Sequence, residues 1–145
     1  MKQQQGFTII ELIVVIVILG ILAATALPRF ADLRGEANFA KMQGLAGGLR
    51  AAVEVTRAKW LAVGSSSLAT VAMADGTSVA VGIAGTAAGV PTTAGILNAI
   101  GSTAGYTTSG AVDFDATGVT GTGCRVSYAA ATGIVTLSAT VAGCQ

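Results

Sequence analysis

An almost unbroken apolar run near the start of the chain constrains its fold more than any other feature. The run extends from Leu12 to Leu27 and follows the stretch Gly6-Phe7-Thr8-Ile9-Ile10-Glu11. As an α-helix, residues 7–27 measure about 31 Å at 1.5 Å per residue, which is enough to cross the hydrocarbon core of a bilayer. The sequence therefore predicts a helix that can span a membrane.

Glu11 stands at the head of this run, where an acidic side chain is unexpected. A carboxylate deep in a bilayer costs about 2.5–3.5 kcal/mol or more. Residues 1–27 fit a cleavable secretory signal, with Lys2 as its positive region and Ala24-Thr25-Ala26 as its cleavage site. They also fit an ordinary transmembrane anchor. Both interpretations leave Glu11 unexplained, because an apolar residue would serve either one better.

A third interpretation accounts for the carboxylate. The stretch from Gly6 to Glu11, with a short basic leader before it and an apolar helix after it, resembles the prepilin signature of type IV pilins and related pseudopilins. The resemblance implies that a prepilin peptidase cuts between Gly6 and Phe7 and methylates the new amine of Phe7. It also implies that Gly20 and Pro28 mark positions where the helix bends or loosens on assembly.

The chemistry of Phe7 and Glu11 agrees with this resemblance. Cleavage would create a cationic amine at Phe7, and Glu11 follows about one helical turn later. An amine and a carboxylate attract each other strongly where the dielectric constant is low. The resemblance implies that Glu11 pairs with the Phe7 amine of an adjacent subunit during assembly. The alternative is an ordinary carboxylate that the helix dipole favours at a helix N-terminus.

Composition argues against several other classes of function. The chain has no histidine, so its serines and threonines cannot form a Ser-His-Asp triad, and we expect no catalytic residues and no enzyme activity. The net charge is +1, without the clustered Lys and Arg of a nucleic-acid face. The glycines of Gly82-Ile83-Ala84-Gly85 lack the lysine and helix start of a nucleotide-binding loop. Asp113 and Asp115 fall short of the six to eight oxygens that calcium takes, so we expect no metal and no cofactor.

Beyond the apolar run, the chain divides into two further parts. Residues 29–64 have an amphipathic pattern and predict that the helix resumes after Pro28. The residues expected on its buried face recur at three- and four-residue steps and are Leu45, Leu49, Val53, Thr56 and Trp60. Residues 65–145 predict a β-rich head. Its expected elements are strands at 68–73, 79–83, 112–115, 124–128 and 134–141, a turn at Asp75-Gly76, a short helix at 91–100, and loops at 85–90 and 101–110.

Cys124 and Cys144 are the complete thiol inventory of the chain. An even pair behind an export-like N-terminus suggests a disulfide formed outside the cytoplasm, and two buried free thiols are the alternative. A zinc site is disfavoured because it would need four ligands. The expected loop of about 20 residues would contribute roughly 3 kcal/mol in the chain-entropy model.

The expected architecture is that of a pilin. It is an α+β fold in which a long N-terminal helix carries an antiparallel sheet on its C-terminal half, and cysteines close a loop near the end. Within the family, several stretches look most like mannose-sensitive haemagglutinin-type pilins. They are Pro28-Arg29-Phe30, Asp32-Leu33, Asp75-Gly76, Cys124-Arg125-Val126-Ser127-Tyr128 and Gly143-Cys144.

The resemblance thus predicts a structural subunit of a type IV pilus. Residues 1–6 are the cleaved leader, residues 7–28 the anchor and filament-core helix, residues 29–64 the amphipathic helix and residues 65–145 the head. The implied partners are the prepilin peptidase, the inner membrane, the pilus assembly machinery and further copies of the chain in a helical filament that serves adhesion, motility or DNA uptake. The alternatives are a type II secretion pseudopilin and a secreted or anchored binding domain.

Overall fold

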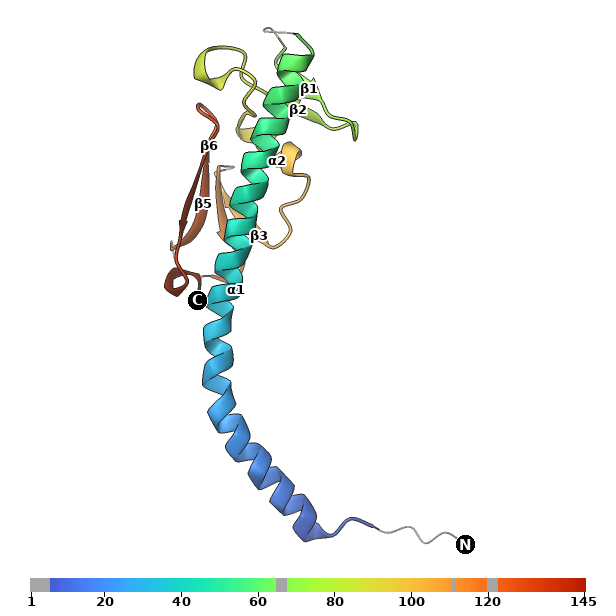
Figure 1. The fold of residues 1–145 in the computed structure, drawn as a ribbon, viewed down its shortest axis with the longest axis vertical. Helices are drawn as coiled ribbons and strands as arrows, with labels where there is room; N and C mark the ends of the chain where they lie inside the picture. The colour runs from blue at the N-terminus through green and yellow to red at the C-terminus, as the bar shows by residue number, and fades with distance from the viewer. Residues whose placement is uncertain (1–5, 65–67, 111, 120–122) are drawn as a thin grey trace, which may run out of the picture. The chain divides into compact units, whose positions relative to one another are not determined.

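The computed structural model describes residues 6–64, 68–110, 112–119 and 123–145, and the side chains of residues 27–32 lie outside this description. The fold is α+β: one long helix, α1 (Ile9–Ala62), is followed by short strands and one short helix (Figure 1). By its contacts the chain divides into two compact units, Met1–Arg34 and Gly35–Gln145.

In the first unit, the N-terminal part of α1 is apolar on all sides. The stretch Ile9–Ala26 has a mean hydropathy of 2.9, and none of its residues is buried. By length and composition it could cross a membrane, as expected for an anchor. The helix continues through Gly20 and Pro28. A bend or loosening at these two positions on assembly remains a prediction.

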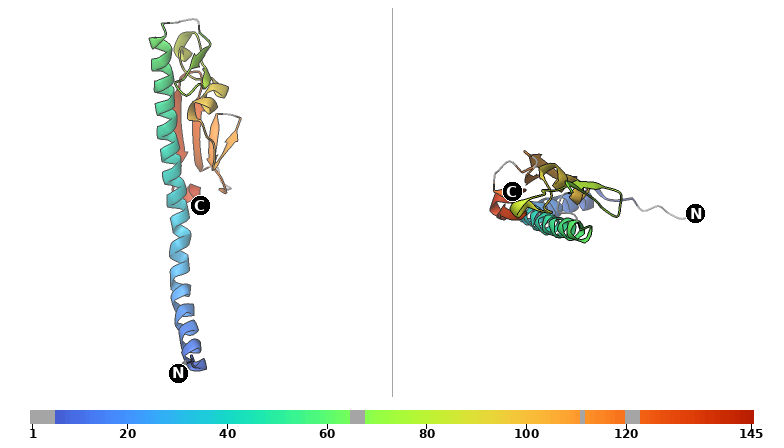
Figure 2. Two further views of the ribbon diagram at one scale, coloured as in Figure 1. Left: turned by 90° about the vertical axis from the view of Figure 1, so that its right-hand side faces the viewer. Right: turned by 90° about the horizontal axis from the view of Figure 1, so that it is seen from above.

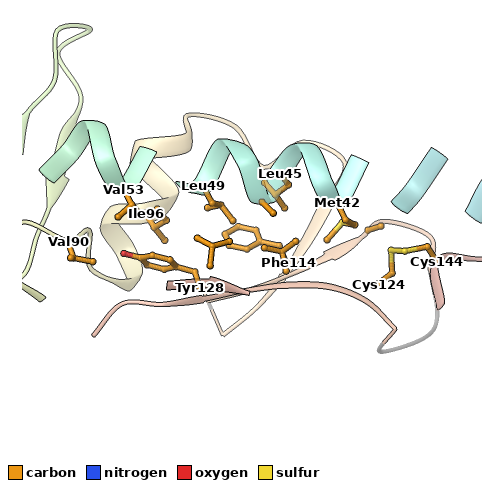
Figure 3. Packing of buried hydrophobic residues seen from close by; sticks show 14 residues of the cluster. Met42, Leu45, Leu49, Val53, Val90, Ile96, Phe114, Cys124, Tyr128 and Cys144 are labelled. Atoms are coloured by element: carbon orange, nitrogen blue, oxygen red, sulfur yellow. A yellow bond between two sulfur atoms is a disulfide. The ribbon is translucent and has the colours of Figure 1, made fainter. Parts of the chain in front are cut away.

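In the second unit, α1 buries one face against the sheet, as its amphipathic pattern predicts. All five residues expected on the buried face are 8% exposed or less. Figure 3 shows Leu45 and Leu49 of the helix pointing toward Phe114 of the sheet, and all three belong to the main hydrophobic cluster. Trp60 packs in a second cluster instead, and its indole Nε1 donates to the carbonyl oxygen of Leu68 at 3.1 Å.

The main sheet is antiparallel, with four strands in the order β3-β4-β5-β6. Its strands are β3 (Tyr106–Ser109), β4 (Asp113–Ala116), β5 (Cys124–Ala129) and β6 (Ile134–Ala139). In β4 and β5, buried side chains alternate with partly exposed ones, as one covered face requires. The α1 segment of this unit runs alongside the sheet in both ribbon views (Figures 1 and 2).

A smaller set of elements lies between α1 and β3 in the sequence. The hairpin β1 (Thr70–Ala72) and β2 (Ser78–Ala80) turns at Asp75-Gly76, as predicted, and Gly76 has a φ of 85°. The helix α2 (Thr93–Ile100) is capped by Thr92, whose side chain accepts a hydrogen bond from the Gly95 amide. The described residues also form the short 3-10 helices η1 (Gly85–Ala87) and η2 (Ala142–Cys144).

One predicted loop is wrong. Residues 106–109, expected within a loop over 101–110, form the edge strand β3 and pair with β4 from Tyr106–Ala116 to Ser109–Asp113. Part of the loop expected at 85–90 is the 3-10 helix η1. The remaining strands and α2 match their predictions except at their ends. Leu68 and Ile83, for example, lie outside β1 and β2.

Candidate functional site

The helix α1 begins just after the expected cleavage site. Gly6, Phe7 and Thr8 are non-helical, and α1 begins at Ile9. Phe7 is 91% exposed. A Cβ added at Gly6 would meet nothing within 4 Å, so packing among the described residues does not require glycine there. The Gly6–Phe7 bond therefore lies in open, non-helical backbone.

Glu11 is held by Thr8 in a reciprocal cap. Its Oε2 atom accepts hydrogen bonds from the Thr8 amide at 3.1 Å and from the Thr8 hydroxyl at 2.8 Å. In return, Thr8 Oγ1 accepts from the Glu11 amide at 3.4 Å. This is a capping box, in which a Thr at the N-cap and a Glu three residues later satisfy amide groups that the first helical turn leaves without partners.

Thr8 was not among the predicted site residues. The sequence does contain a signal for its role, because a capping box is typically a Thr followed three residues later by Glu at the start of an apolar run. The structure brings Glu11 beside Thr8 and next to the segment that contains Gly6 and Phe7. Gly20 and Pro28 lie further along α1, outside this local arrangement.

The second predicted site, the cysteine pair, is a disulfide. Cys124 and Cys144 are bonded, with their Cα atoms 4.8 Å apart, and both residues are fully buried (Figure 3). The bond joins the start of β5 to the 3-10 helix η2. Asn38 of α1 adds a hydrogen bond from its Nδ2 to the carbonyl oxygen of Cys144 at 2.9 Å.

Close backbone approaches hold the same C-terminal turn in place. A Cβ at Gly35 would lie 2.6 Å from the carbonyl oxygen of Val141, and a Cβ at Gly123 would lie 2.8 Å from Gly143. Side chains at these positions would push the turn away from α1 or from the start of β5. The cysteine pair is evident from the sequence, whereas the supporting roles of Asn38 and these glycines are seen only in the structure.

Asp113 and Asp115, the carboxylates considered for calcium, contact a guanidinium. Arg125 bonds Asp115 through two nitrogens at 2.8 Å, and it reaches Asp113 at 3.3 Å. The hydrogen bonds and charge of Asp115, followed by the charge of Asp113, raise the pKa of Arg125. All three side chains are partly exposed. Arg125 lies on β5 and both aspartates lie on β4, so these ion pairs link the two neighbouring strands.

An open groove of about 460 Å³ lies between α1 and the head, whose Met73, Ile100 and Tyr106 form part of its wall. Small residues of the helix form much of its wall, including Gly44, Gly48 and Ala51. A Cβ at Gly44, Gly47 or Gly48 would meet nothing within 4 Å. No packing contact within the described part of the chain therefore requires these three glycines.

Comparisons with known proteins agree with the N-terminal motif. A family model described as "Prokaryotic N-terminal methylation motif" matches residues 1–27. The chain is 51% identical over 51 residues to the "Type IV narrow pilus major component PilA5" of Thermus thermophilus, covering 35% of this chain and 44% of that protein.

Two further relatives are a fimbrial protein and a type IV pilin. The match to a "Fimbrial protein" of Moraxella nonliquefaciens is 46% identical over 57 residues, covering 39% of this chain and 37% of that protein. The match to the "Type IV major pilin protein PilE1" of Neisseria gonorrhoeae is 45% identical over 60 residues, covering 39% and 36%. The chain thus spans less than half the length of each relative. No solved structure gives a significant match.

Proposed function

We propose that this chain is a structural subunit of a type IV pilus and a substrate, not an enzyme, in its own processing. One observation carries the proposal: a helix apolar on all sides, with none of Ile9–Ala26 buried, begins with a single carboxylate at Glu11. Such a helix needs an apolar surrounding outside its own chain. The bilayer supplies it before assembly, and the helices of other subunits supply it in a filament.

The N-terminal geometry supports cleavage after Gly6. A prepilin peptidase would cut the exposed Gly6–Phe7 bond, release residues 1–6 and leave an amine on Phe7 for methylation. Glu11 then pairs with the Phe7 amine of a neighbouring subunit while the assembly machinery extracts residues 7–28 from the inner membrane. The opposite charges attract most strongly in the apolar filament core.

The remaining parts of the chain have separate roles in this proposal. The uncovered glycine face at Gly44 and Gly48 lets neighbouring helices approach closely, and Gly20 and Pro28 allow the core helix to loosen on assembly. The head, residues 65–145, faces outward from the extracellular filament and supports adhesion. The stretches around Asp75 and Cys124 support a finer proposal, that among type IV pilins the chain is most like the mannose-sensitive haemagglutinin type.

The mature N-terminus tests this function directly. Mass spectrometry of the chain from cells that assemble pili should find methylated Phe7 at the N-terminus. Glu11→Ala should still be cut there but should be lost from purified filaments, because the Phe7 amine then has no carboxylate partner. An N-terminus at Leu27 would instead support an ordinary signal peptide and would refute the proposal.

The length and location of the filaments distinguish the pilus from the pseudopilin alternative. Electron microscopy of long surface filaments that contain this chain supports the pilus. Short filaments formed only with an active secretion system would support the pseudopilin. The disulfide between Cys124 and Cys144 favours the pilin, because the major subunit of the pseudopilin family typically relies on bound calcium instead of a cysteine pair.

A further inference from the structure

The capping box gives Glu11 a partner before the proposed Phe7 amine exists. While residues 1–6 are attached, the nitrogen of Phe7 is an ordinary amide. The Glu11 carboxylate nevertheless accepts two hydrogen bonds, from the amide and the hydroxyl of Thr8, at 3.1 and 2.8 Å. Hydrogen bonds to a charged acceptor are stronger than neutral ones, so these contacts reduce the penalty of a carboxylate at the head of an apolar helix.

The same contacts determine where the carboxylate points. Without Thr8, a glutamate side chain in the first turn would sample several rotamers. With Thr8, the carboxylate lies back over the helix N-terminus, beside the residue that directly follows Phe7. Glu11 nevertheless remains exposed, so an amine from another chain can reach it.

We propose that Thr8 is a positioning residue for assembly: its hydroxyl holds the Glu11 carboxylate at the helix N-terminus, ready for the amine of an incoming subunit. The inference rests on the proposed pilus function and deepens it. Thr8 does not itself pair with the amine. It lowers the number of conformations that the carboxylate must give up when it binds, which is the general advantage of preorganisation.

Two matched substitutions test the role of the hydroxyl. Thr8→Val keeps the branched shape and removes the hydroxyl, whereas Thr8→Ser keeps the hydroxyl and removes the methyl group. The measurement is the amount of each variant in purified filaments, divided by the amount of its mature, Phe7-terminated form in the membrane. We expect Thr8→Val to lower this ratio about fivefold, equivalent to about 1 kcal/mol for a lost N-cap, and Thr8→Ser to restore it.

The other outcomes are distinguishable. Equal ratios for Thr8→Val and the wild type would overturn the positioning role. A loss shared by Thr8→Val and Thr8→Ser would also overturn it, because the hydroxyl would then not be the active group. Accumulation of uncut Thr8→Val precursor would make Thr8 a determinant of cleavage instead of assembly. Failure of the wild-type chain to form filaments would reject the proposed function itself.

Discussion

The two units of this chain are built from one continuous helix but solve the problem of apolar surface in opposite ways. From Ile9 to Ala26 the helix is apolar on all sides, and none of it is buried. From Met42 to Trp60 one face of the same helix is buried, and apart from the exposed Val55 the rest is polar or small. Apolar side chains that recur with the helical period indicate a partner inside the chain, whereas apolar side chains on all faces indicate a partner outside it.

This difference also separates the sources of stability. The second unit has its own core, in which Met42, Leu49 and Phe114 are fully buried. Its C-terminal turn is tied to this core by the disulfide and by Asn38. The first unit has no such contacts in the described residues, so the stability of its helix depends on its surroundings.

Removal of the first unit should have the largest effect. A chain of residues 35–145, exported so that its disulfide forms, should be folded and monomeric in detergent-free buffer. The full chain should require detergent, because its apolar helix is uncovered. Size-exclusion chromatography and circular dichroism measure both properties. An unfolded or aggregated fragment would show that the second unit depends on the first, and the comparison would then fail.

A smaller but still large effect is expected from Phe114→Ala. Phe114 is fully buried between the sheet and α1, and truncation of a buried phenylalanine typically costs about 3–5 kcal/mol. Urea unfolding of the second unit, monitored in the full chain in detergent, measures the loss. Val14→Ala is the matched control, because Val14 is 50% exposed and belongs to the first unit. A similar loss in both variants would contradict the separation of the two units.

Much of the second unit follows from local sequence patterns. The buried face of α1 was predicted from the spacing of Leu45, Leu49 and Val53, because a helix of 3.6 residues per turn brings such positions to one side. The Asp75-Gly76 dipeptide predicts the hairpin turn. The structure confirms it, because Gly76 has a positive φ, which glycine tolerates best. These signals are local, so the sequence alone contains them.

The parts that were missed depend on distant contacts or weak patterns. Strand β3 lacks an alternating pattern, because Thr107, Thr108 and Ser109 are all exposed and the strand has one neighbour. Asn38 meets Cys144 across 106 positions, and no short-range pattern encodes that contact. Thr8 differs from both, because its three-residue spacing to Glu11 is a local sequence signal of a capping box.

The smallest expected effect concerns Tyr128 and appears only at high pH. Burial raises the pKa of Tyr128 to about 12, and its hydroxyl donates to the carbonyl oxygen of Pro91 at 2.5 Å. In the unfolded chain a tyrosine has a pKa of about 10. The folded state thus binds this proton more tightly than the unfolded state, so the contribution to stability is complete below pH of about 10 and is lost as the pH rises toward about 12.

Tyr128→Phe isolates this contribution. The variant should be less stable at neutral pH by about 1–3 kcal/mol, since the Pro91 carbonyl loses its buried donor. Its unfolding free energy should then fall less steeply than that of the wild type between pH of about 10 and about 12. Both tyrosines of the chain lie in the second unit, so this titration is insensitive to the anchor helix. Equal slopes for the two proteins would mean that Tyr128 ionises as readily in the folded chain as in the unfolded one, and its burial would then not resist ionisation.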